Sequence, residues 1–62
     1  MNKEKMINEL DKILNKLEDL QLAMTDLELT EPNNSQLDYA DNTMSNAYDN
    51  LCSAVYHLKM SK

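Results

Sequence analysis

Apolar residues recur every seven positions on both sides of a single proline, Pro32, and this spacing constrains the fold more than any other feature of the chain. If Leu10 is position a of a heptad, seven of the eight a and d positions between Lys3 and Leu27 are apolar. A β-strand would instead alternate every second residue. The spacing therefore predicts a first helix over about residues 3–28.

The second half of the chain keeps this period with a different composition. Its a positions carry large apolar residues, namely Leu37, Met44, Leu51 and Leu58. Its d positions carry only alanine: Ala40, Ala47 and Ala54. A column of small side chains lets a neighbouring helix approach to within about 8 Å. We predict a second helix over about residues 36–60 whose alanine column faces another helix, either the chain's own first helix or one from a second copy.

The segment between the two patterns reads as a turn over about residues 29–35. Pro32 disfavours helical geometry at Glu31 and has no N–H to donate. Ser35 followed by Asp38 resembles a capping box, and Asn33 or Asn34 is an alternative cap. A connection this short places the two helices side by side and antiparallel.

The 62 residues make a single unit, and such short chains bury too little apolar surface to be comfortably stable alone. One cysteine excludes an internal disulfide, and one cysteine with one histidine is too few ligands for structural zinc. Self-association is the remaining way to stabilise so short a chain. We therefore predict an all-α antiparallel hairpin over residues 1–62 that dimerises into a four-helix bundle. The expected dimer core is Leu10, Leu17, Leu20, Ala40, Ala47, Leu51, Ala54 and Leu58.

The size and the hairpin layout resemble the Rop family, small RNA-binding plasmid regulators that dimerise as four-helix bundles. The resemblance covers the whole chain length and includes no sequence motif. It implies a dimer and, as one alternative function, RNA binding through lysines of the first helix. The absence of arginine and the acidic balance of the chain speak against that alternative.

Charge is distributed unevenly along the chain, whose net charge is −5. All six cations are lysines, and none lies between Lys16 and Lys59, a stretch that contains eight acids. Folding the hairpin brings the lysines together at the termini and makes the turn acidic. Two hairpins that run in opposite directions would place each acidic turn beside the other's lysines, so charge favours that arrangement.

The sequence contains no motif for catalysis or for binding a metal or a cofactor. His57 and Cys52 are single residues on different helix faces, and Asp38 with Asp41 falls short of the oxygens that calcium needs. We predict that the protein is not an enzyme and binds neither metal nor cofactor. The first ten residues are charged and no apolar run is long enough for a membrane span, so we expect a cytoplasmic protein.

The surface of the second helix carries the most distinctive pattern. Its c and f positions form a polar, nearly uncharged stripe bounded by two tyrosines: Tyr39, Asn42, Asn46, Asp49, Ser53 and Tyr56. Tyrosine is favoured at recognition surfaces because it offers contact area with little loss of entropy. We predict that this tyrosine stripe, together with Asp38 and Asp41, binds another protein.

These observations predict a small non-catalytic regulator or inhibitor that acts as a homodimer through protein–protein contact. A composition rich in Asn, Lys and Met would suit a phage or mobile element. One further alternative is an acidic mimic of nucleic acid that inhibits a DNA-binding or defence protein, since carboxylates can occupy a basic site. Direct contact with nucleic acid is not expected. The sequence does not identify the partner.

Overall fold

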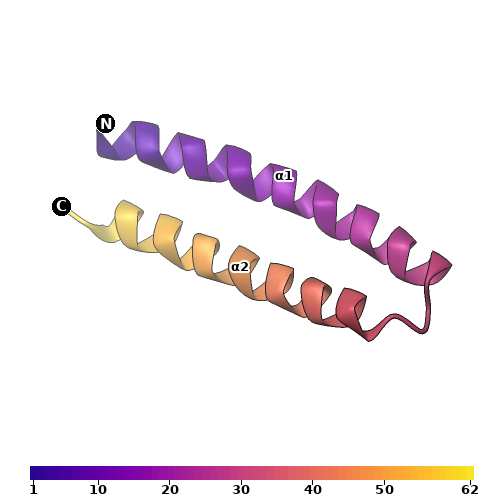
Figure 1. The fold of residues 1–62 in the computed structure, drawn as a ribbon. Coiled ribbons are helices and arrows are strands. Elements are labelled where there is room, and N and C mark those ends of the chain that lie inside the picture. Colours follow the sequence, from indigo (N-terminus) through magenta and orange to yellow (C-terminus); the bar gives the residue numbers. More distant parts are fainter.

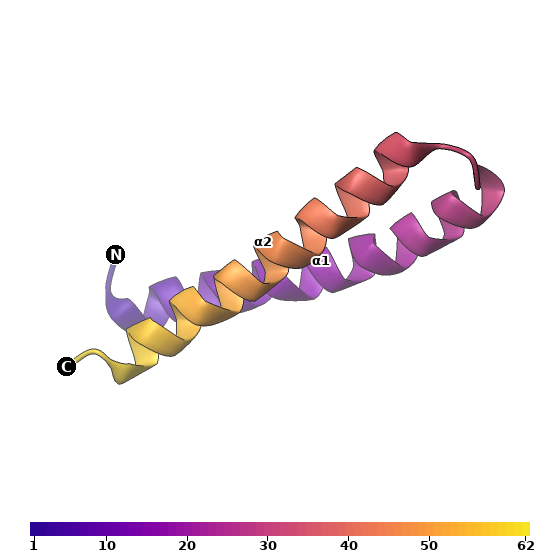
Figure 2. The ribbon, with the colours of Figure 1, turned by 90° about the horizontal axis from the view of Figure 1, so that it is seen from below.

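The computed structural model describes residues 1–62 and shows two long helices, α1 (Lys3–Thr30) and α2 (Ser35–Met60). The helices lie side by side and antiparallel, with both termini at one end and the turn at the other (Figure 1). Viewed from below, the same hairpin is a narrow rod, 48 Å long and about 15 Å across (Figure 2). The all-α helical hairpin predicted from the sequence is confirmed.

Each helix begins at an asparagine that caps it. The Asn2 side chain accepts a hydrogen bond of 2.8 Å from the Lys5 N–H, and the Asn34 side chain accepts one of 3.1 Å from the Gln36 N–H. These bonds satisfy N–H groups that the helix itself leaves without partners. The cap of α2 is therefore Asn34, and Ser35 is already the first helical residue rather than the first residue of a capping box.

The turn is shorter than expected, because α1 continues through Thr30 instead of ending near residue 28. The helix stops at Glu31, whose backbone (φ −134°, ψ 65°) is not helical. This is the residue before Pro32, where the proline ring disfavours helical geometry. The Thr30 hydroxyl donates to the Leu27 carbonyl at 2.8 Å, and the same carbonyl accepts the Glu31 N–H at 3.1 Å. Four residues are thus enough to reverse the chain.

The core of the hairpin is thin. Only Leu14 (9% exposed) and Val55 (7% exposed) are buried, one from each helix, and both occupy position e. The half-buried apolar residues around them occupy mainly position a: Leu10, Leu17, Met24, Leu37, Met44, Leu51 and Leu58. The a and e columns therefore form the contact between α1 and α2. Neither helix combines the length and the hydropathy that a membrane span requires.

Candidate interaction surfaces

One side of the hairpin carries polar bridges between the helices, and these bridges fix which residues face which way. The Tyr48 hydroxyl donates to the Glu18 carboxylate at 2.5 Å, and the Gln21 amide donates to the Ser45 hydroxyl at 3.2 Å. Glu18 and Ser45 are both at position b of their heptads. The b columns of the two helices therefore lie on the same side, which we call the polar face.

The opposite side of the hairpin is an apolar face. At about 100° of rotation per residue, position d lies on one side of the a and e contact and position b on the other. Because the b columns share one side, the d columns share the other. This apolar face consists of Met6, Ile13, Leu20 and Leu27 from α1, with Ala40, Ala47 and Ala54 from α2. The four α1 residues are 39–51% exposed, so their side chains stand largely free of α2.

The alanine column lies at the edge of the contact between α1 and α2 and not at its centre. Ala47 is exposed, and Ala40 and Ala54 are half-buried at the edge of the hairpin. Of the predicted dimer core, Leu10, Leu17, Leu51 and Leu58 are half-buried between the helices, whereas Leu20 is 45% exposed beside the alanines. The structure thus distributes the predicted core between a contact within the hairpin and a face that is open. The number of large exposed apolar side chains indicates a binding surface.

The bridge between Tyr48 and Glu18 perturbs the tyrosine. Donation of the hydroxyl proton to the carboxylate, with smaller contributions from desolvation and from the negative charge of Glu18, raises the pKa of Tyr48 to about 12. The bond is stable only while the phenol keeps its proton. Its contribution to folding is therefore complete below the ordinary tyrosine pKa and is lost as the pH rises through about 12.

Three acids converge where α1 meets α2 beside the turn. Glu28 and Asp41 both occupy position e and meet across the helix contact, with Asp38 nearby. A hydrogen bond to Asp41, desolvation, and the negative charges of Asp41 and Asp38 raise the pKa of Glu28 above its ordinary value of 4.5. When both carboxylates are ionised, neither has a proton to donate, and the buried Oε1 atom of Glu28 has no hydrogen-bond partner. Two like charges thus face each other at the turn.

Replacing Glu28 with glutamine is expected to stabilise the hairpin at pH 7. The amide donates a hydrogen bond to Asp41 and removes one of the two facing charges. Because the pKa of Glu28 is raised, the contact of its protonated carboxyl with Asp41 stabilises the folded hairpin fully below pH 4.5. This stabilisation is lost as the pH rises through the folded-state pKa of Glu28. The gain from Glu28→Gln should therefore be largest at neutral pH and shrink on acidification.

Thermal melting followed by circular dichroism across this pH range measures the difference from wild type. Glu31→Gln, at an exposed acid in the turn, is the matched control. A gain from Glu28→Gln that does not depend on pH would contradict the carboxylate pair.

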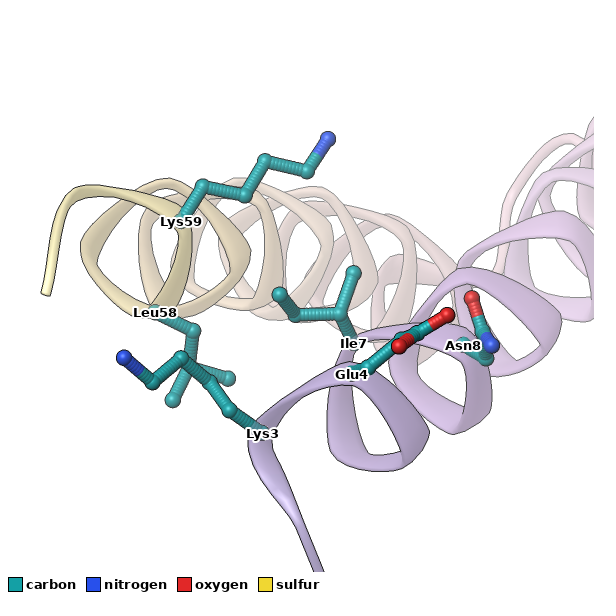
Figure 3. Close-up of a pocket in the computed structure, with 6 residues that line it drawn as sticks. All are labelled: Lys3, Glu4, Ile7, Asn8, Leu58 and Lys59. Carbon is teal, nitrogen blue, oxygen red and sulfur yellow. The ribbon is translucent and has the colours of Figure 1, made fainter. Parts of the chain in front are cut away.

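The open end of the hairpin holds a shallow hollow of about 390 Å³ on the polar face. Ile7 and Leu58 lie between the helices there, and the longer polar side chains of Lys3, Glu4 and Lys59 surround them (Figure 3). The Lys3 ammonium also donates to the Ser61 carbonyl at 2.9 Å and ties the two ends of the chain together. A second hollow near the turn is lined by Glu18, Gln21, Leu22, Thr25 and Asp41. Neither hollow is apparent from the sequence, because each is built from residues of both helices.

The residues predicted to bind a partner fall on two different surfaces. Tyr39 (65% exposed) and Tyr56 (58% exposed) stand on the outer side of α2, together with the exposed Asn42, Asn46 and Asp49. Asp41 instead turns inward against Glu28. The structure therefore brings the tyrosine stripe together as a surface of α2 and separates Asp41 from it. The exposed Leu22 and Leu29 stand on the outer side of α1.

The remaining reactive residues are dispersed. Cys52 is an exposed free thiol at position b, on the polar face. The His57 ring makes an edge contact with the neighbouring Tyr56 ring, with 5.4 Å between their centroids. No group of three or more His, Cys, Asp or Glu side chains is arranged to hold a metal ion.

Comparison with protein-family models, with curated proteins and with solved structures found no match. The resemblance to the Rop family therefore rests on size and hairpin layout alone.

Proposed function

We propose that the protein is a small non-catalytic regulator or inhibitor that acts as a homodimer through contact with another protein. The apolar face is the observation that supports this proposal most strongly. Its four large α1 side chains and its alanine column form a continuous apolar strip along the rod. In a chain with only two buried residues, covering this strip by a second copy supplies the core that the hairpin lacks.

A second copy on the apolar face leaves the outer side of α2 free for a partner. The tyrosine stripe offers two exposed aromatic rings on a helix surface that carries one charge, Asp49. Solubility alone would be served by lysine and glutamate there. Truncating a good tyrosine anchor costs about 2 kcal/mol or more at an interface.

Tyr39→Ala and Tyr56→Ala are expected to weaken capture of the partner by at least about tenfold. The test is affinity capture from the native host followed by mass spectrometry, and then titration of the recovered partner with each variant. Light scattering on each variant verifies that its assembly state is unchanged. Asn8→Ala and Asn15→Ala, at exposed f positions of α1, are the matched controls. Wild-type affinity in both tyrosine variants would show that the stripe is not the binding surface.

An acidic mimic of nucleic acid is the second candidate, and one observation favours it. The turn end concentrates Glu28, Asp38 and Asp41, and no lysine lies nearby in the sequence. Contact through exposed charges weakens steeply as salt is added, whereas contact through tyrosines does not. Partner binding that collapses with salt and withstands Tyr56→Ala would favour the mimic over the tyrosine stripe.

A further inference from the structure

The outer edge of α1 beside the apolar face carries a charge pattern that reverses along the helix. Position c of α1 reads Lys5, Lys12, Asp19 and Asp26: two bases and then two acids. Position c lies on the side of α1 away from α2, about 100° around the helix from position d, with position g between them. The b residues Glu18 and Ser45 reach across to the neighbouring helix. Long side chains at position c can in the same way reach a helix that covers the apolar face.

These four charges have no ionic partners that would explain the pattern within the hairpin. The single ion pair in the structure joins Lys12 to Glu9 at 3.3 Å, one turn apart on α1. Lys12 is 74% exposed in that pair, and pairs of this kind contribute little to stability. Lys5, Asp19 and Asp26 form no ion pair at all.

We propose that the apolar face is covered by a second copy running in the opposite direction, so that α1 packs on the partner's α1 and α2 on the partner's α2. This inference rests on the homodimer of the proposed function and adds its geometry. Reversing α1 against itself places Ile13 opposite the partner's Leu20 and Met6 opposite the partner's Leu27. The same reversal places Lys12 beside the partner's Asp19 and Lys5 beside the partner's Asp26. One alignment thus pairs the apolar column with itself and brings the opposite charges of position c to within two residues of the same level.

The packing of α2 on the partner's α2 is also compatible with this arrangement. Its d column is entirely alanine, which permits two helices to approach closely. The column that flanks these alanines, position g, carries no formal charge, so two copies of α2 meet without like-charge repulsion: Gln36, Thr43, Asn50 and His57. The alternative dimer, with both turns at one end, packs α1 on the partner's α2. That arrangement places the four charges of α1 beside this uncharged column and brings both acidic turns together.

Exchanging the charges of α1 tests the arrangement without changing the net charge. The variant combines Lys5→Asp, Lys12→Asp, Asp19→Lys and Asp26→Lys. It should dimerise with itself about as well as wild type does, because every exchanged charge still meets an opposite one. Mixed with wild type, it should form few heterodimers, because in a heterodimer each charge meets its own sign. Native mass spectrometry of isotope-labelled wild type mixed with the variant measures the share of heterodimers.

We expect that share to fall several-fold below the statistical one. Heterodimers at the statistical share would overturn the opposed arrangement while leaving the homodimer intact. A wild-type chain that stays monomeric would overturn the homodimer itself.

A distance measurement tests the direction independently of the charge exchange. A spin label on Asn33→Cys in the turn, with Cys52→Ser to remove the native thiol, gives one label per chain. Opposed hairpins place the two labels at a separation close to the 48 Å length of the rod. Hairpins with both turns at one end place the labels side by side. A short distance in pulsed electron paramagnetic resonance would overturn the proposal.

Discussion

Replacing Leu20 with aspartate is expected to abolish self-association, whereas replacing Leu22 with aspartate is expected to leave it intact. Leu20 is 45% exposed and lies in the middle of the apolar face, beside the alanine column. Leu22 is 71% exposed and lies on the outer side of α1, away from that face. The two substitutions therefore introduce the same charge two residues apart, on different surfaces of one helix.

The size of the Leu20 effect follows from burial of a charge. A carboxylate that must leave water without a partner costs several kcal/mol, and a two-fold dimer contains it twice. We expect the dissociation constant to rise by at least about a hundredfold, which corresponds to roughly 3 kcal/mol. Sedimentation equilibrium across a concentration series measures both variants against wild type. Equal effects of Leu20→Asp and Leu22→Asp would mean that the dimer, if one forms, does not use the apolar face.

Truncating Leu14 to alanine is expected to remove a large part of the total stability. Leu14 is one of only two buried side chains, and its loss leaves a cavity that few neighbours can fill. Substitutions of this kind cost roughly 2–5 kcal/mol. A chain of this length is stable by only about 3–9 kcal/mol, so the variant should be marginally folded at room temperature.

Urea unfolding followed by circular dichroism measures this loss. Leu29→Ala is the control, because Leu29 is 76% exposed and loses almost no contacts on truncation. Its stability should stay within about 0.5 kcal/mol of wild type. A Leu14→Ala variant as stable as the Leu29→Ala control would show that the a and e contact is not the core.

The helices and their antiparallel arrangement could be predicted from the sequence because they depend on local rules. The seven-residue spacing marks two helices, and Pro32 ends the first one through its effect on Glu31. The predicted end of α1 near residue 28 is two residues too early: Leu29 and Thr30 carry no feature that stops a helix, so α1 continues to the residue before Glu31. The cap was open among three candidates, since Asn33, Asn34 and Ser35 are all suitable capping residues.

The division of the apolar residues between two contacts could not be predicted in the same way. The heptad pattern groups positions a, d and e as one stripe, and the sequence does not say which part faces α2. That choice depends on how the two helices rotate about their axes as they pack, which is a property of the pair. The carboxylate pair of Glu28 and Asp41 has the same origin, because it joins two e positions thirteen residues apart in the chain.

Because the core of the hairpin is thin, the cellular concentration of this protein would affect how much of it is folded. If the proposed homodimer completes the interior, the folded fraction of the chain rises with its own concentration. At low expression, most molecules of such a dimer would be unfolded monomers and exposed to proteases. When more is made, association protects them. Such a protein responds to its rate of synthesis more steeply than a stable monomer does, so that its level behaves as a threshold without any separate control element.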